Sequence, residues 1–267
     1  GILVMSRRTV DDYQQRRPMW SRLEQYFHRF TKKALGNSEK IVQQLCLEGF
    51  KPEQVGLIYN GIEMEPFQNL PTKLELRNNL GFNPDALVFI VVANLYPYKG
   101  HMDLLNAFAL IADQLPNNWQ LFCAGRSVNT LENLENHAKT LGIDSHVRFL
   151  GSRTDTAKLF AASDVAISSS HEEGLSNSVL EAMATGLPLV VTNVGGNAEA
   201  VQDMVTGLVV PPKKPEILAN ALLTVALDPK LRQTYGNAGK ERVLKLFTLQ
   251  QCVQQYSDFY KSLSTDA

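Results

Sequence analysis

The sequence has little net charge and no long apolar run. Its 26 Lys and Arg residues nearly balance its 27 Asp and Glu residues, so the formal net charge is -1. This balance argues against an electrostatic grip on nucleic acid as the main activity. The longest apolar runs, such as residues 87–93, are far shorter than the ~20 residues that a membrane-spanning helix requires. Charge and hydrophobicity therefore give no reason to expect even peripheral membrane contact.

Cysteine is also scarce. Only Cys46, Cys123 and Cys252 occur, and they lie far apart without metal-ligand spacing. We therefore expect a reduced, cytoplasmic setting and no disulfide framework. The first residues, GILVM, are too short for the apolar region of a signal peptide and lack its cationic lead. They predict a buried strand, and we expect a chain that begins inside a strand to lack its start.

The composition that remains is that of a globular protein. Hydrophobic residues make up 44% of the chain and charged residues 20%, enough for one large domain or two ordinary ones. From about residue 85 onward, apolar runs alternate with segments of helical period. The run LVFIVVANL predicts a strand covered on both faces. Further strands are expected in WQLFCAG, VRFLG, DVAISSS, LPLVVT and TGLVVP, helices at 101–115, 131–141 and 177–185, and another helix that ends at 159–162. This alternation predicts an α/β fold with a doubly wound parallel sheet.

The ends of the chain are organised differently. Residues 18–35 and 38–48 predict helices, and VGLIYN predicts a strand that ends at the turn Asn60-Gly61. Residues 62–84 contain three prolines and only one short helical stretch, which is typical of a linker. A final helix is expected at 249–263, where Cys252, Tyr256, Phe259 and Tyr260 recur at helical spacing.

The stretch HEEGLSNSVLEAMATGLP carries the clearest chemical signal. It follows a predicted strand and opens a predicted helix, so it lies where open parallel sheets bind ligands. The unpaired N–H groups of that helix would attract an anion, and Ser176 or Asn177 could cap it. Glu173 before the helix and Glu181 one turn inside it could accept hydrogen bonds from hydroxyls. Because Gly174 has no β-carbon, a ligand could approach the main chain closely. A nucleotide sugar, with phosphates between two hydroxyl-rich groups, has the matching form.

Each of these features also has an ordinary structural explanation. Glutamate suits the start of any helix, and Glu181 on spacing alone is more often a solvated surface residue. Lys99, which follows the first strand of the domain, is more often a surface lysine, and Gly195-Gly196 more often a turn. Their agreement at one edge of one sheet favours the functional interpretation, in which the Lys99 ammonium meets a diphosphate.

Several motifs in order resemble one known family. The spacing E-x7-E from Glu173 to Glu181, YPYKG before it, VGGNAEAV after it and IYNGIE at 58–63 are similar to those of family 4 glycosyltransferases of the GT-B fold. The likeness covers nearly the whole chain. It implies two Rossmann-like domains across a cleft, the C-terminal one holding the nucleotide-sugar donor and the N-terminal one mainly the acceptor.

The resemblance also implies roles for individual residues. Lys99 would stabilise the departing diphosphate, Glu173 would bind the transferred sugar, and Glu181 would bind the ribose. Main-chain groups of Gly174, Leu175, Ser176 and Asn177 would reach the sugar and the distal phosphate, beside Gly195 and Gly196. The base would lie near Arg148, Phe149 and Leu150, and near Gly125 and Arg126. Arg7, Arg8 and Tyr13 are candidates for the border of the acceptor cleft, although surface roles are the commoner outcome.

The implied reaction is a hexosyltransferase-like transfer with retention of configuration, without a metal or other cofactor. No D-x-D triplet occurs in the chain. The leaving phosphate would help to deprotonate the acceptor, so the main catalytic term would be charge stabilisation by Lys99 and the helix terminus. One departure concerns the diphosphate site. The family often has an arginine before the lysine, where this chain has Asn94, which can donate a hydrogen bond but carries no charge.

A second departure concerns the N-terminal domain. Family members carry roughly a hundred further residues before a segment like SRRTVDDY, in line with ordinary domain sizes. We therefore expect a remnant of the acceptor-side domain at 1–66, a linker at 67–86, the donor-binding domain at 87–247, and a helix at 248–267 that packs back on the N-terminal domain. The acceptor would be a glycan, a lipid-linked sugar or a small molecule.

Three rival functions are worth weighing. A nicotinamide dehydrogenase would need G-x-G-x-x-G after its first strand, and LVFIVVANL is followed by no such match. A glycosidase pair of carboxylates needs no phosphate site. The stronger alternative is a nucleotide-sugar-binding fragment that does not catalyse, because transfer requires both faces of the cleft whereas binding requires only one. The sequence leaves the base, the sugar and the acceptor open.

Overall fold

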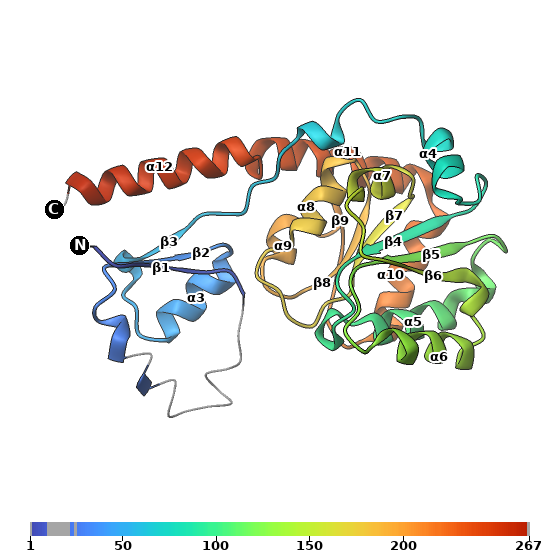
Figure 1. Ribbon diagram of the computed structural model, residues 1–267, viewed down its shortest axis with the longest axis horizontal. Coiled ribbons are helices and arrows are strands. Elements are labelled where there is room, and N and C mark those ends of the chain that lie inside the picture. Colours follow the sequence, from blue (N-terminus) through green and yellow to red (C-terminus); the bar gives the residue numbers. More distant parts are fainter. Residues whose placement is uncertain (1, 10–21, 24–25, 266–267) are drawn as a thin grey trace.

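Two parallel sheets organise the molecule (Figure 1). The computed structural model describes residues 2–9, 22–23 and 26–265. One sheet has three strands in the order β1-β2-β3, and the other has six strands in the order β6-β5-β4-β7-β8-β9. All of their strand pairs are parallel. The α/β class expected from the sequence is confirmed.

The small sheet consists of β1 (Val4–Arg7), β2 (Lys33–Gly36) and β3 (Val55–Leu57), with α3 (Glu39–Leu47) packed against it. The hydroxyl of Ser38 caps α3 by accepting from the Ile41 amide. Two sequence predictions are corrected here. β1 is a strand, but it is an edge strand and only half-buried, because one side has no described neighbour. Residues 33–35 form β2 instead of ending a helix, since Ala34 and Leu35 are buried between two strands. Part of the predicted helix 18–35 lies outside the described residues.

The large sheet is buried on both faces. Its strands are β4 (Val88–Val92), β5 (Gln120–Ala124), β6 (Val147–Gly151), β7 (Val165–Ser168), β8 (Leu189–Thr192) and β9 (Gly207–Val210). Alternate residues of β4 enter different cores: Phe89 and Val91 face one, Val88 and Ile90 the other. This explains why the run that predicted β4 is continuously apolar.

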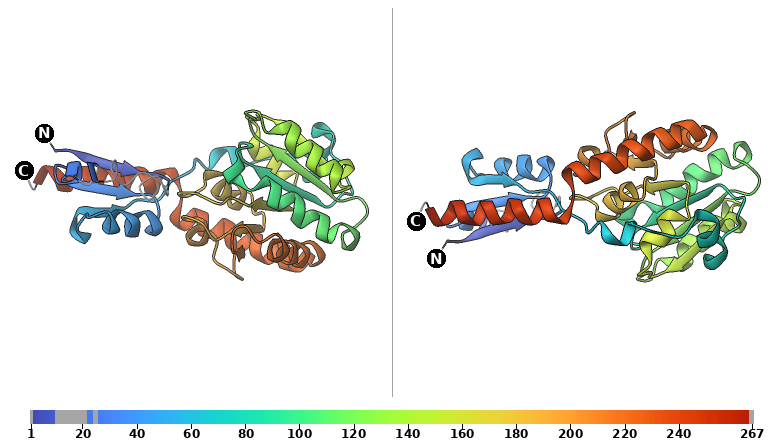
Figure 2. Two further views of the ribbon diagram at one scale, coloured as in Figure 1. Left: turned by 90° about the horizontal axis from the view of Figure 1, so that it is seen from below. Right: turned by 90° about the horizontal axis from the view of Figure 1, so that it is seen from above.

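Helices cover both faces of this sheet (Figures 1 and 2). The first core receives side chains from α5 (His101–Ile111), α6 (Leu131–Thr140) and α10 (Pro215–Leu227). The second receives them from α4 (Lys73–Leu80), α7 (Thr156–Ala161), α8 (Asn177–Ala184) and α11 (Pro229–Leu246). A short helix, α9 (Asn197–Ala200), follows β8. The sequence interpretation assigned no helix to α10 or α11.

The connecting segments are tied to the large sheet. Residues 67–86, expected to form a linker, contribute Phe67, Leu76 and Phe82 to the second core. α12 (Leu249–Thr265) leads from this sheet toward the small one, and its start is bonded to the Gly61–Ile62 segment (Figures 1 and 2). The proposed domain bounds, 1–66, 67–86, 87–247 and 248–267, stay predictions. Within the described part of the chain, no helix is both long and apolar enough to cross a membrane.

Candidate donor-binding site

The large sheet changes direction between β4 and β7. From β4 the chain builds outward through β5 to β6, and from β7 it builds the other way through β8 to β9. The loops after β4 and β7 therefore leave the sheet on opposite sides, and a crevice forms between them at the carboxyl edge. Lys99 lies in the first loop and Glu173 in the second. The fold thus brings together the two residues that the sequence placed in the reaction.

Lys99 and Glu173 form an ion pair. Lys99 Nζ lies 2.6 Å from Glu173 Oε1, and their side chains are 16% and 12% exposed. Ser170 Oγ donates a hydrogen bond of 2.8 Å to the same carboxylate oxygen. An ion pair so little exposed is shielded from salt and holds both side chains in place. The ammonium and the carboxylate thus neutralise each other at the crevice.

The two loops that carry this pair are fastened together. The amide of His171 donates to the carbonyl of Tyr98 over 2.7 Å, and Ser169 Oγ donates to the carbonyl of Lys99 over 3.0 Å. Gly100 has φ +70°, and a β-carbon there would lie 2.0 Å from the Ser169 carbonyl oxygen. Glycine is therefore required at this position. The His171 ring meets Asp103 at 2.7 Å and adds a side-chain link.

The glycines after β7 and β8 serve close packing of main chain. A β-carbon on Gly174 would lie 1.9 Å from the carbonyl oxygen of Arg8. The sequence interpretation gave this glycine the task of admitting a ligand, whereas its neighbour in the structure is the N-terminal segment. Gly195 has φ +49° and lies against the Glu173 carbonyl, and the Gly196 amide donates to the Gly174 carbonyl. These contacts fix the loop on which Glu173 sits.

Glu181 occupies a half-buried place on α8. Thr156 Oγ1 donates a hydrogen bond of 3.0 Å to Glu181 Oε2. Burial raises the pKa of the Glu181 carboxyl, and the Thr156 hydrogen bond opposes this only in part. A cavity of about 620 Å³ opens beside Glu181 and is lined also by Thr156, Asn177 and residues from the 61–70 segment. A carboxylate in such a place can accept hydrogen bonds from the hydroxyls of a ligand.

The start of α8 has no capping side chain. Ser176 occupies the N-cap position, but no backbone amide donates to its side chain. Its hydroxyl lies instead 3.0 Å from that of Ser178. The capping expected of Ser176 or Asn177 is therefore not seen. The first amides of α8 keep the partial positive charge of a helix start, which favours an anion.

Asn60 is a residue of the site that sequence reasoning missed. It follows β3 in the small sheet, and its side-chain nitrogen donates to the Leu175 carbonyl over 3.0 Å and to Asn177 Oδ1 over 2.9 Å. The motif IYNGIE was noticed but no role was given to its asparagine. A polar residue just beyond the carboxyl end of a parallel strand was the available signal. Asn60 links the two sheets at the start of α8.

Residues after β5 and β6 extend the same edge. The amide of Arg126 donates to Asn94 Oδ1 over 3.0 Å, and Arg126 Nη2 donates to the Tyr96 hydroxyl over 3.2 Å. The amide of Gly125 donates to the Gly151 carbonyl over 2.8 Å. The loops after β4, β5 and β6 therefore meet at one place, and the roles expected of Asn94, Gly125 and Arg126 there stay predictions.

Arg148 is not brought to this edge. It lies near the amino end of β6, its Nη1 donates to the carbonyl of Gly81, and its guanidinium lies 5.3 Å from the centre of the Phe122 ring. Phe149 and Leu150 are partly buried and pack against different cores. Any contact of this strand with a base would have to involve its carboxyl end.

The candidates for an acceptor border are dispersed. Arg7 of β1 pairs with Glu48 at the end of α3, whereas the main chain around Arg8 and Thr9 contacts Gly174. Tyr13 lies outside the described residues. Glu199 of α9 accepts hydrogen bonds from the Glu39 and Lys40 amides at the start of α3. The two sheets are thus linked beside the site.

Comparisons with known proteins point to one family. The family described as "Glycosyl transferases group 1" matches residues 72–242. A D-inositol 3-phosphate glycosyltransferase of Kribbella flavida is 33% identical over 217 residues, which cover 78% of this chain and 51% of that protein. A galactosyltransferase of Escherichia coli, named as UDP-Gal:alpha-D-GlcNAc-diphosphoundecaprenol alpha-1,3-galactosyltransferase, is 26% identical over 85% of this chain and 58% of its own length. The chain spans about half the length of the curated relatives that it matches.

Solved structures resemble the fold closely. The crystal structure of Anabaena Alr3699/HepE in complex with UDP and glucose has a TM-score of 0.88 and is 25% identical, and the match covers 98% of this chain and 72% of that one. WaaG, a glycosyltransferase involved in lipopolysaccharide biosynthesis, has a TM-score of 0.79 at 20% identity, and shows likeness of fold alone.

Proposed function

The chain belongs to the family of group 1 glycosyl transferases and has the GT-B type of α/β fold, and from this we propose that it binds a nucleotide-diphosphate sugar and takes part in transfer of the sugar to an acceptor hydroxyl. The observation that carries the proposal is the Lys99–Glu173 pair at the crevice between β4 and β7. A phosphate group needs a positively charged partner, which Lys99 supplies. Sugar hydroxyls can donate hydrogen bonds to a carboxylate, which Glu173 supplies.

Lys99 is the proposed partner of the diphosphate. Its ammonium lies at the carboxyl edge of the sheet, and the uncapped start of α8 is the second positive element there. A departing nucleoside diphosphate gains negative charge, so fixed positive groups lower the barrier to its departure. Donor binding would replace the carboxylate at Lys99 by a phosphate. The Glu173 carboxylate so released would accept hydrogen bonds from the transferred sugar.

Glu181 is the proposed partner of the ribose. It shares a loop–helix unit with Glu173 but faces the cavity that Thr156 and Asn177 line. Two neighbouring ribose hydroxyls can both donate to one carboxylate. The finer assignments, to family 4 and to transfer with retention and without a metal, also belong to this proposal. In that route the leaving phosphate takes up the acceptor proton, so no protein nucleophile is needed.

The proposed base of the donor nucleotide is uracil. Alr3699/HepE, whose structure matches 98% of this chain, was crystallised in complex with UDP and glucose. The acceptor stays open among glycans, lipid-linked sugars and small molecules. The alternative weighed from the sequence, a nucleotide-sugar-binding protein without transfer, is favoured by no observation on the described residues.

Calorimetric titration with UDP, GDP and ADP tests the proposal. We expect UDP to bind more tightly than the other two, and Glu181→Ala to weaken UDP by about tenfold, which is the loss of one charged hydrogen-bonding partner. Glu241→Ala, at an exposed position of α11, is the matched control and should leave binding unchanged. The proposal fails if none of the three diphosphates binds, or if the two variants behave alike.

A further inference from the structure

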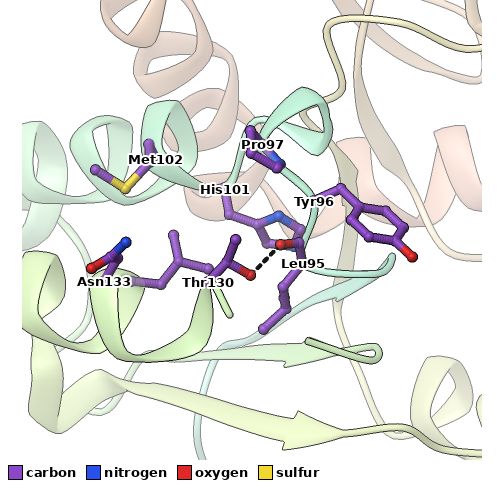
Figure 3. Close-up of a pocket in the computed structure, with 8 residues that line it drawn as sticks. Leu95, Tyr96, Pro97, His101, Met102, Thr130 and Asn133 are labelled. Atoms are coloured by element: carbon purple, nitrogen blue, oxygen red, sulfur yellow. Dashed lines mark hydrogen bonds between the residues drawn. The ribbon is translucent and has the colours of Figure 1, made fainter. Parts of the chain in front are cut away.

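A separate pocket lies between the starts of α5 and α6 and is lined in part by the loop that follows β4 (Figure 3). It encloses about 310 Å³ and is lined by Leu95, Tyr96, Pro97, His101, Met102, Thr130, Asn133 and Leu134. Neither Glu173 nor Glu181 contributes to it. A volume of this size suits a single small ring.

The pocket is a groove that the two helices form at their starts. Met102 lies in the first turn of α5, and Asn133 and Leu134 lie in the first turn of α6. One turn further along, His137 Nε2 and Asn106 Oδ1 meet at 2.7 Å and join the helices. Thr130 Oγ1 donates to the Leu95 carbonyl at the base of the groove. The walls of the pocket are therefore held by hydrogen bonds on both sides.

His101 is the unexplained polar group of this pocket. Its side chain is 3% exposed, and neither Nδ1 nor Nε2 has a hydrogen-bond partner among the described residues. Figure 3 shows the ring extending from the start of α5 toward Leu95, with Met102 on the other side. Buried polar atoms are nearly always satisfied, so an imidazole with two unpaired nitrogens indicates a missing partner.

The imidazole is neutral. Burial, together with the nearby charge of Lys99, lowers the pKa of His101 to about 4. At neutral pH one ring nitrogen then donates and the other accepts. None of the eight lining residues is charged, so a charged ligand would find no counter-charge here.

We propose that this pocket binds a small neutral aromatic hydroxyl compound, whose ring lies among Leu95, Pro97 and Met102 and whose hydroxyl bonds to His101. The apolar walls and the methionine sulfur suit an aromatic ring. The hydroxyl matches a neutral imidazole because it can donate to the free ring nitrogen or accept from the ring N–H. The site is distinct from the proposed donor site and does not require a nucleotide.

The test uses methionine methyl-labelled protein and phenol as the probe. Met102 reports on the pocket, and Met102→Leu assigns its signal. We expect phenol to shift that signal saturably, with Kd on the order of 1 mM for so small a ligand. Toluene, which lacks the hydroxyl, and benzoate, which is charged, should each bind at least about tenfold more weakly.

Two variants address the walls of the pocket. His101→Phe keeps a ring but removes the nitrogens, and it should weaken phenol by about tenfold. Asn133→Trp, at an exposed rim position, should block the pocket without disturbing the core, and Asn136→Trp one turn on is its control. The proposal is overturned if phenol causes no saturable shift of the Met102 methyl signal, which is the result expected of a pocket that holds only water. It is also overturned if toluene binds as well as phenol, or if Asn133→Trp and Asn136→Trp bind phenol equally.

Discussion

Lys99 and Glu173 meet at 2.6 Å between the loops that follow the neighbouring strands β4 and β7. Each is the other's partner at the place where the proposed donor must bind. The pair explains how two charged side chains can be only 16% and 12% exposed. It also means that Lys99 has to exchange the Glu173 carboxylate for a phosphate when a donor binds. The affinity for the donor therefore reflects the difference between the Lys99–phosphate and Lys99–Glu173 interactions.

This exchange predicts opposite effects of Glu173→Gln on two ligands. The variant frees Lys99 from its competing carboxylate, so UDP alone should bind more tightly, by about three- to tenfold. UDP-sugar should gain less or lose affinity, because the sugar then lacks an ionised acceptor. Parallel calorimetric titrations measure the ratio of the two affinities. If that ratio is the same in Glu173→Gln as in the parent chain, Glu173 does not contact the sugar.

Glu181 predicts a pH dependence of UDP binding. Burial raises its pKa above the ordinary value of 4.5, and only the ionised form accepts hydrogen bonds from two ribose hydroxyls. UDP affinity should therefore fall as the pH falls through this raised pKa. Thr156→Val removes a hydrogen bond to the carboxylate and should move the fall to higher pH.

The phosphates of UDP also titrate in this range, so the measured quantity is the affinity relative to Glu181→Gln at each pH. The free energy of unfolding should also depend on Glu181, but it should fall as the pH rises. Because the pKa of Glu181 is raised in the folded state, protonation favours folding, so this contribution is present at low pH and is lost as the pH rises through the pKa. A pH-independent affinity ratio between the parent chain and Glu181→Gln would contradict the role given to Glu181.

Asp164 links α4 to the large sheet, and we expect this link to be sensitive to acid. It accepts from Arg77 over 2.6 Å and from the Val88 amide over 2.8 Å. Burial alone would raise its pKa, but the charges of Lys73 and Arg77 and the Val88 hydrogen bond hold it below 3.8. Arg77 is 5% exposed and also donates to the carbonyls of Pro84, Ala86 and Ala162.

Arg77→Met should therefore lower the free energy of unfolding at pH 7 by about 3 kcal/mol, because it removes the buried ionic partner of Asp164 and the donor to three carbonyls and leaves the exposed Lys73 ammonium as the counter-charge. Lys73→Ala, whose side chain is 47% exposed, should change it by less than about 1 kcal/mol. A depressed pKa stabilises the fold above the unfolded value and ceases to do so as the pH falls through the folded value. Urea unfolding of Asp164→Asn should therefore differ from the parent at pH 7, and the difference should shrink as the pH falls below about 4 toward the lowered pKa of Asp164.

Two glycines of α11 predict opposite effects of the same substitution. A β-carbon on Gly236 would lie 2.0 Å from the Gly186 carbonyl oxygen, whereas at Gly239 the nearest atom is Met183 Cγ at 3.7 Å. Gly236→Ala should destabilise the fold by about 2 kcal/mol, because backbone has to move. Gly239→Ala should stabilise it by about 0.5–1 kcal/mol through helix propensity. Equal shifts in urea midpoint would mean that α11 does not pack closely against the turn at Gly186.

The sequence predicts the large sheet well because its strands are buried on both faces. A continuous apolar run such as β4 has few alternatives. Parallel strands end at one edge, so the contact between Lys99 and Glu173 followed from their places after two of those ends. The buried strand β2 was taken for the end of a helix because its pairing with β1 and β3 is a tertiary contact that periodicity does not report.

Other features depend on contacts that no local pattern contains. Gly174 packs against Arg8, and Leu175 accepts a hydrogen bond from Asn60, and both of these neighbours are distant in sequence. The family resemblance placed Arg148 near the base, but a motif does not report that the Arg148 guanidinium turns to the carbonyl of Gly81. The unpaired His101 could not be found at all without the packing of α5 against α6.

The central claim is that Lys99 binds the diphosphate of a nucleotide, and titration of Lys99→Met with UDP and with uridine tests it most directly. Methionine keeps much of the length of the side chain but has no charge. The account predicts that UDP binding weakens by about 10- to 100-fold, the value of a charge-assisted contact, while uridine binding is unchanged. An unchanged affinity for UDP, or an equal loss for UDP and uridine, would contradict it.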